Sequence, residues 1–183
     1  MPKPDILHQE IIAQSRLFRI ERLELRFSNG VEVEYERLIG SGNSHGAVLV
    51  VPLLDDETVL LIREYAAGVH RYELALPKGR IEAGESPLEA ANRELMEETG
   101  YGARALSEMG QLTLAPAYIR GASHIILARD LYPSHRTGDE PEPIEVIPWR
   151  LDNLSALLQH EECSEARSIA ALFMTREHLL REH

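Results

Sequence analysis

The feature that most constrains the fold is a sharply bounded acidic helix in the middle of the chain. Ser86 and Pro87 form a typical helix start, and Glu89 completes a capping box with the serine. Gly100 supplies the stop signal. These signals predict a helix over residues 86–98. Its buried face is expected to consist of the small and apolar residues at helical spacing, Leu88, Ala91, Leu95 and Thr99.

Segments of alternating apolar and polar residues surround this helix. Asn29-Gly30 separates two such runs, over 17–27 and 31–38, and predicts a β-hairpin because both residues tolerate positive φ. A second strand pair is predicted over 46–53 and 58–63, turned at Asp55-Asp56. Further strands are expected over 72–76, 106–114, 123–128 and 145–149, and further helices over 151–160 and 165–180. This order predicts a mixed sheet with helices packed on it.

The length and composition fit a chain that builds its own core. With 183 residues, 44% of them hydrophobic, no disulfide framework is needed, and the single cysteine excludes one. A glycine- and serine-rich stretch, 40–44, is predicted to join an N-terminal hairpin segment (residues 1–44) to a main domain (residues 45–183). No signal peptide is visible, and the longest apolar run, 47–54, is far shorter than a membrane helix. A cytoplasmic protein without membrane association is therefore expected.

The charge balance narrows the range of partners. Lys and Arg total 19 against 30 Asp and Glu, which gives a formal net charge of −11. Proteins that bind nucleic acid usually carry a basic footprint, so no nucleic-acid partner is expected. A chain this acidic that handles phosphates has to recruit cations.

Three carboxylates on the central helix are candidates for binding such cations. Glu94, Glu97 and Glu98 lie at i, i+3 and i+4 and therefore share one stripe, although like charges at this spacing each cost about 0.2–0.5 kcal/mol. Such a stripe is either a solvated acidic surface or a site for a hard divalent cation, which prefers oxygen ligands. Gly79 and Gly84 just before the helix permit close backbone approach to such a site.

The segment 79–101 resembles the Nudix box, the signature of the Nudix hydrolase family. The matching residues are Gly79, Glu85, Arg93, Glu94, Leu95, Glu97, Glu98 and Gly100, with Tyr101 in a position that is usually aliphatic. The resemblance implies an α/β fold, the Nudix α/β/α sandwich with a mixed sheet. It also implies metal-dependent hydrolysis of nucleoside diphosphates that are linked to another group.

The resemblance assigns roles by position. The metal ligands would be Glu94, Glu98, Glu97 and Glu85, together with the backbone carbonyl of Lys78. They would hold Mg²⁺ or Mn²⁺, two or three ions with substrate bound. Gly79, Arg93, Gly100 and Pro116 would be structural residues, with Arg93 holding the glutamates in place through ion pairs.

The flanking sequence is similar to the ADP-ribose pyrophosphatase subgroup, in the segments 61–65 and 72–79 and in Pro116. The segments 114–118 and 138–143 are most similar to bacterial members that hydrolyse several ADP compounds. This implies ADP-ribose, diadenosine triphosphate and NADH as substrates, with AMP released from ADP-ribose. Many ADP-ribose enzymes have an arginine where this chain has Ala66, and its loss implies a broad range of ADP compounds.

The residue that activates water is left open by the sequence. In the subgroup a glutamate on the loop after the box has this role, which makes Glu142 the first choice and Glu140 the second. Glu97 within the box is the competing base, and a merely solvated acidic loop is the alternative.

Substrate contacts are implied at two further places. Tyr35 and Glu36 correspond to an aromatic–acid pair that binds adenine in ADP-ribose hydrolases, often across a homodimer interface; ordinary sheet packing is the alternative for the tyrosine. Arg63 and Glu64 would contact the terminal ribose or phosphate, or else form a surface ion pair.

Two rival functions follow from the same box. One is hydrolysis of other Nudix substrates, such as dinucleoside polyphosphates, NADH alone, nucleoside triphosphates or capped RNA. The other is a non-catalytic Nudix-fold module that senses a nucleotide; retention of every box glutamate favours an enzyme.

Overall fold

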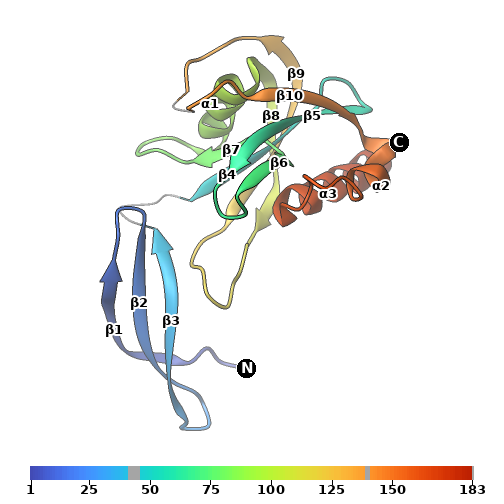
Figure 1. Ribbon diagram of the computed structural model, residues 1–183. Coiled ribbons are helices and arrows are strands. Elements are labelled where there is room, and N and C mark those ends of the chain that lie inside the picture. Colours follow the sequence, from blue (N-terminus) through green and yellow to red (C-terminus); the bar gives the residue numbers. More distant parts are fainter. Residues whose placement is uncertain (41–45, 139–140, 183) are drawn as a thin grey trace. The chain divides into compact units, whose positions relative to one another are not determined.

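The computed structural model describes residues 1–40, 46–138 and 141–182, and they form two compact units (Figure 1). The first unit comprises residues 1–44 together with 113–122, and the second comprises 45–112 and 123–183. Inclusion of the segment 113–122 in the N-terminal unit was not expected from the sequence. Within the described residues, no helix is long and apolar enough to cross a membrane.

The N-terminal unit is a three-stranded antiparallel sheet in the order β1 (Asp5–Gln14), β2 (Phe18–Arg26) and β3 (Glu32–Gly40). β2 and β3 are the predicted hairpin, and the Gly30 N–H donates to the Phe27 carbonyl in its turn. The predicted hairpin is confirmed, and β1 adds a third strand that the sequence did not predict. Two register shifts, at Ile6/His8 and Ile11/Ala13, interrupt the apolar alternation that would have revealed this strand.

The second unit contains a mixed sheet in the order β7-β4-β9-β8. β4 (Ala47–Pro52) runs parallel to β9 (Ser123–Pro133) and antiparallel to β7 (Lys78–Arg80), and β8 (Tyr101–Leu112) lies antiparallel to β9. A smaller antiparallel sheet has the order β10-β5-β6, made of β10 (Glu145–Arg150), β5 (Thr58–Ala66) and β6 (Arg71–Ala75).

The predicted strand pair over 46–53 and 58–63 was wrong, although both strands exist. β4 and β5 belong to different sheets, and the chain between them forms only a short turn with the Leu53–Val59 bridge and a hydrogen bond from the Leu54 N–H to the Thr58 carbonyl. β4 is a central strand that is buried on both faces, as strands in parallel pairing usually are. Its partners come from distant parts of the chain, and sequence proximity to β5 gave no guide to them.

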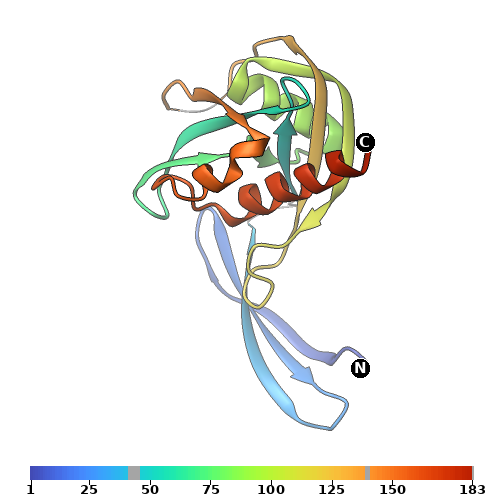
Figure 2. The ribbon, with the colours of Figure 1, turned by 90° about the vertical axis from the view of Figure 1, so that its right-hand side faces the viewer.

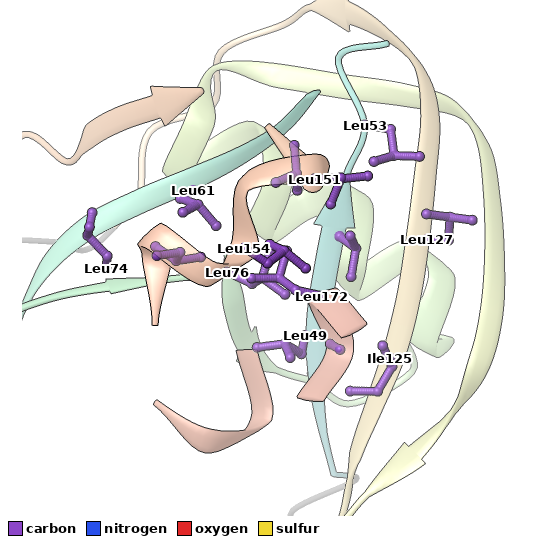
Figure 3. Close-up of a cluster of buried hydrophobic side chains, with 14 residues drawn as sticks. Leu49, Leu53, Leu61, Leu74, Leu76, Ile125, Leu127, Leu151, Leu154 and Leu172 are labelled. Carbon is purple, nitrogen blue, oxygen red and sulfur yellow. The ribbon is translucent and has the colours of Figure 1, made fainter. Parts of the chain in front are cut away.

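Helices cover both faces of the mixed sheet (Figure 1, Figure 2). On one face, Leu49 and Val51 pack with the 3₁₀ turn η1 (Leu151–Asn153), α2 (Leu154–Leu157) and α3 (Ala166–Glu182) (Figure 3). On the other face, Val48 and Val50 pack against α1 (Pro87–Thr99). The predicted α/β/α sandwich with a mixed sheet is therefore confirmed. The helix predicted over 151–160 is shorter, because its last turns close with three-residue spacing from His160 to Leu157.

The caps of α1 form as the sequence predicts. Ser86 and Glu89 form both bonds of the capping box, and Gly100 ends the helix at φ 74°, a left-handed conformation that favours glycine. Apart from Arg93, the buried residues of α1 are adjacent pairs at four-residue intervals, residues 90–91, 94–95 and 98–99. Extended backwards, this pattern reaches residues 86–87, so the prediction that Leu88 is buried was wrong, and the residue is 38% exposed.

Candidate active site

Strand β7 and helix α1 bring the box residues together. β7 pairs with β4 through Gly79 and Val48, which places Gly79 directly against the side chain of Glu94. A Cβ atom at residue 79 would lie 1.9 Å from Glu94 Oε1, so only glycine allows this carboxylate to approach the strand. Glu94 and Glu98 are both buried, although they are charged residue types.

Arg93 connects three of the box carboxylates. Its Nε donates to Glu85 Oε1 at 2.8 Å, and its Nη1 donates to Glu94 Oε1 at 2.7 Å and to Glu97 Oε2 at 3.0 Å. Its Nη2 donates to the Arg80 carbonyl at 2.8 Å. These bonds, led by that to Glu85, hold the pKa of Arg93 above its ordinary value, and the same guanidinium lowers the pKa of Glu85. The cationic side chain neutralises a group of charges that would otherwise repel one another.

Glu98 has a different environment. Its Oε2 accepts a hydrogen bond from the Lys78 N–H at 2.9 Å, and its side chain is almost fully buried. Burial raises the pKa of Glu98 to about 8, while the charge of Lys78 acts in the opposite direction. The Lys78 ammonium itself pairs with Glu64 at 2.8 Å. We refer to Glu64, Glu85, Glu94, Glu97 and Glu98 as the carboxylate cluster.

The carboxylate cluster is not arranged as a finished metal shell. Among the residues that the structure describes, no three acidic, histidine or cysteine side chains converge closely enough to hold a metal ion. Arg93 lies between Glu85, Glu94 and Glu97 and accounts for their separation. The donor set still fits a hard divalent cation, because all its atoms are oxygens and because a cation would favour the charged form of the buried Glu98.

A cavity of about 530 Å³ adjoins this cluster. Its walls include Glu97 and Glu98 from α1 and Glu142 from the loop before β10, so two segments far apart in sequence meet there. Tyr72 on β6 donates its phenolic hydrogen to Glu142 Oε1 at 2.7 Å, which raises the pKa of the phenol. Of the three candidate bases, Glu97 and Glu142 thus line one cavity, whereas Glu140 lies outside the described residues.

Arg63 and Glu64 are both engaged by protein side chains, though not by each other. Arg63 forms two hydrogen bonds of 2.7 Å to Glu162, and its guanidinium lies 4.3 Å from the centre of the Tyr72 ring. A smaller cavity of about 70 Å³ is lined by Arg63, Glu64 and Glu142 among others. Both residues therefore form ion pairs with other side chains, and their contact with the terminal ribose or phosphate stays a prediction.

Three predicted residues belong to the N-terminal unit and are described within it. Tyr35 and Glu36 are consecutive residues of β3, so their side chains lie on opposite faces of the sheet. Tyr35 is paired with Leu23, and Glu36 with Arg22. Pro116 lies in the segment 113–122. The structure does not bring Tyr35 and Glu36 together as a pair on one face.

Sequence reasoning missed two side chains that contact carboxylates lining the cavity. Tyr72 holds Glu142, and Arg136 lies 3.1 Å from Glu97, Nε to Oε1. Tyr72 was assigned only to a strand, and no local pattern linked it to a loop 70 residues further on. Arg136 did offer a signal, because it is a basic residue just before the acidic loop that carries Glu142.

Comparisons with known proteins agree with this geometry. The family model of the NUDIX domain matches residues 43–173, and that of the NudE-type Nudix hydrolase N-terminal domain matches residues 4–37. The chain is 47% identical to ADP compounds hydrolase NudE of Escherichia coli strain K12, over 98% of this chain and 95% of that protein. It is 30% identical to the ADP-ribose pyrophosphatase of Bacillus subtilis, over 69% of this chain and 70% of the relative.

A solved structure extends the similarity to three dimensions. A crystal structure of an ADP compounds hydrolase superposes with a TM-score of 0.90 at 47% identity, and the match covers 100% of this chain and 97% of the other. The similarity therefore includes the N-terminal sheet as well as the α/β/α sandwich. The chain belongs to the Nudix hydrolase family, with an N-terminal domain of the NudE type.

Proposed function

We propose that the chain hydrolyses the pyrophosphate of ADP-linked compounds, namely ADP-ribose, diadenosine triphosphate and NADH, and releases AMP from ADP-ribose. The observation that carries the proposal is the complete box on α1 and β7 in a chain whose relative over nearly its full length is named ADP compounds hydrolase. A relative named ADP-ribose pyrophosphatase adds support.

The carboxylate cluster would hold the divalent ions that such a reaction needs. The proposed ligands are the carboxylates of Glu85, Glu94, Glu97 and Glu98 and the backbone carbonyl of Lys78, with two or three Mg²⁺ or Mn²⁺ ions when substrate is bound. When bound, these ions would neutralise phosphate charge and lower the pKa of water. A pyrophosphate would otherwise be repelled by the glutamates. Arg93 would keep the carboxylates in place by sharing them with the ions.

The proton transfer would fall to a glutamate at the cavity. A water oxygen forms a bond to phosphorus, the bridging P–O bond breaks, and the carboxylate accepts the proton that the water loses. Glu142 is our first choice, because it lines the cavity opposite α1 and its carboxylate is oriented by Tyr72. Glu97 is the alternative on α1, and Glu140 remains a second choice on the loop.

Substrate contacts are proposed in both units of the chain. Tyr35 is a candidate to stack on adenine, since the residue is 45% exposed on β3. Glu36 lies on the other face of the sheet, so the Tyr35 and the Glu36 that bind one adenine would come from different copies of the chain. Arg63 and Glu64 would contact the terminal ribose or phosphate, which requires Arg63 to loosen its pairing with Glu162.

We also propose that the chain is a homodimer. Within the described part of the N-terminal unit, Leu23 alone among the apolar side chains is buried. Register places Leu23 on the same face as Ile6, Val33 and Tyr35, all of which are exposed. A sheet with so little core gains stability when a second copy covers that face.

Paired substitutions on neighbouring residues test the dimer. Val33 lies on the apolar face of the sheet and Glu34 on the opposite face. Val33→Lys should convert the protein to a monomer in sedimentation velocity, whereas Glu34→Lys should leave it dimeric. A wild-type monomer, or equal effects of both substitutions, would contradict the proposal.

The partners and the compartment proposed for the chain rest on its sequence. We propose a small-molecule nucleotide as the ligand, no nucleic-acid or membrane partner, and the cytoplasm as the compartment. The formal net charge of −11 supports the absence of a nucleic-acid partner.

The experiment that tests the function is AMP release from ADP-ribose, followed chromatographically with and without Mg²⁺. Wild type should require the ion, and Glu98→Gln should lose turnover by at least about a hundredfold, as removal of a metal ligand or its support typically does. Glu108→Gln on β8, which removes a carboxylate paired with His124, serves as the control. Tight binding of ADP-ribose that needs no metal and yields no product would instead indicate a nucleotide sensor.

A further inference from the structure

Arg136 lies between two residues that line the cavity, and it is not part of the box. It belongs to the segment after β9, which is fixed to the end of α1 by two backbone bonds, Ser134 N–H to the Gly100 carbonyl at 2.9 Å and Arg136 N–H to the Met96 carbonyl at 3.3 Å. His135 and Thr137 on either side of it line the 530 Å³ cavity. The backbone of Arg136 is thus held beside the carboxylate cluster.

The guanidinium of Arg136 contacts the cluster at its rim. Its Nε lies 3.1 Å from Glu97 Oε1; the arginine side chain is 58% exposed, while that of Glu97 is 13% exposed. Its charge also contributes to lowering the pKa of Glu85, although less than the adjacent Arg93 does. The positive group therefore lies beside Glu97, a carboxylate that lines the cavity and is a proposed metal ligand.

The other basic side chains near the cavity are held more firmly. Arg93 is buried and bonded to three carboxylates and a carbonyl, Lys78 pairs with Glu64, and Arg63 forms a two-bond pair with Glu162. Arg136, by contrast, contacts Glu97 from a largely exposed position, and exposed ion pairs contribute little stability. Its guanidinium can reorient at small cost.

We propose that Arg136 binds the diphosphate of the substrate and exchanges Glu97 for phosphate oxygens when cations occupy the carboxylate cluster. Guanidinium groups are well suited to phosphate because their planar donors bond two oxygens at once. This would supply a phosphate contact in a chain that has Ala66 where many ADP-ribose enzymes have an arginine. The inference rests on the proposed function in taking a diphosphate as the ligand.

Calorimetric titrations with ADP and with adenosine, both in saturating Mg²⁺, test the inference without relying on turnover. Arg136→Gln should weaken ADP binding about tenfold or more and leave adenosine binding unchanged, since a hydrogen bond to a charged group is lost. Arg136→Lys should recover part of the loss. Arg104→Gln is the matched control, because Arg104 is a similarly exposed arginine that pairs with Asp130 on the sheet.

The outcomes separate this inference from the proposed function. If wild type binds ADP through Arg136 but does not hydrolyse ADP-ribose, the function fails and the inference stands. If Arg136→Gln lowers kcat while ADP affinity stays at the wild-type value, the arginine merely positions Glu97 and the inference is overturned. Equal losses for ADP and adenosine, or no binding of ADP by wild type, also overturn it.

Discussion

Removal of Arg93 should expose the electrostatic cost of the carboxylate cluster. Arg93→Met keeps much of the side-chain length and removes the guanidinium that bonds Glu85, Glu94 and Glu97. The three carboxylate side chains are only 11–21% exposed, so water compensates poorly for the lost cation. The variant should therefore be destabilised when no divalent ion is present.

The expected loss of stability follows from the burial of Arg93 and its three carboxylate partners. Breaking a buried ion pair from one side costs about 3–5 kcal/mol, because the remaining charges are left without a partner. For a chain of this length, each kcal/mol lowers the melting temperature by about 2–4 °C, so Arg93→Met should melt roughly 6–20 °C below wild type. Arg104→Met removes an arginine whose side chain is 61% exposed, and it should lower the melting temperature far less.

Magnesium should partly reverse this loss. A cation that binds the folded state alone raises stability, and it binds more tightly where negative charge is unpaired. Differential scanning calorimetry in metal-free buffer and in saturating Mg²⁺ should show that the ion raises the melting temperature of Arg93→Met more than that of wild type. The reasoning would be refuted if the variant melted with wild type in metal-free buffer, or if Mg²⁺ stabilised wild type more.

Two further predictions concern a close contact and a titrating group. Gly79→Ala would place a Cβ 1.9 Å from Glu94 Oε1 and should cost about 1–3 kcal/mol in urea unfolding, whereas Gly68→Ala, which meets nothing within 4 Å, should be near neutral. Burial raises the pKa of Glu73, but hydrogen bonds led by that from Arg71 outweigh it, and the net pKa is lowered. The Glu73 carboxylate therefore contributes to folding stability above about pH 4.3, and this contribution is lost as the pH falls. The unfolding free energy of wild type should decrease on acidification more steeply than that of Glu73→Gln. Parallel plots of unfolding free energy against pH for the two proteins would contradict this.

Local sequence signals predicted the elements better than their pairing. The caps of α1 are local devices, because Ser86 bonds Glu89 at one end and Gly100 bonds the Met96 carbonyl at the other. β1 escaped notice because its register shifts break the alternation that marks a strand. β4 and β5 were assigned to one hairpin because they are adjacent in sequence, but β4 pairs with the distant β7 and β9, and β5 pairs with the distant β10 and with β6, which follows it.

In the candidate site, too, local sequence patterns predicted some features, whereas others depend on long-range packing. The helix caps and the spacing of Glu94, Glu97 and Glu98 predicted one helix with a shared stripe, and family resemblance gave these glutamates and Glu85 their roles as metal ligands. The degree of burial of Glu98 and the insertion of Arg93 between carboxylates depend on the packing of β7 against α1. The approach of Arg136 and Glu142 depends on segments that follow β9, and such long-range contacts leave no periodic signal in the sequence.

The central claim is that the glutamates of α1 hold divalent cations. Crystals equilibrated with Mn²⁺ and measured at a wavelength sensitive to manganese test it most directly, since the anomalous signal locates the ion without any assumption about the substrate. We expect at least one peak within coordination distance of Glu94 and Glu98, and its loss in Glu98→Gln. An ordered α1 that shows no manganese beside these two carboxylates at saturating Mn²⁺ would contradict the account.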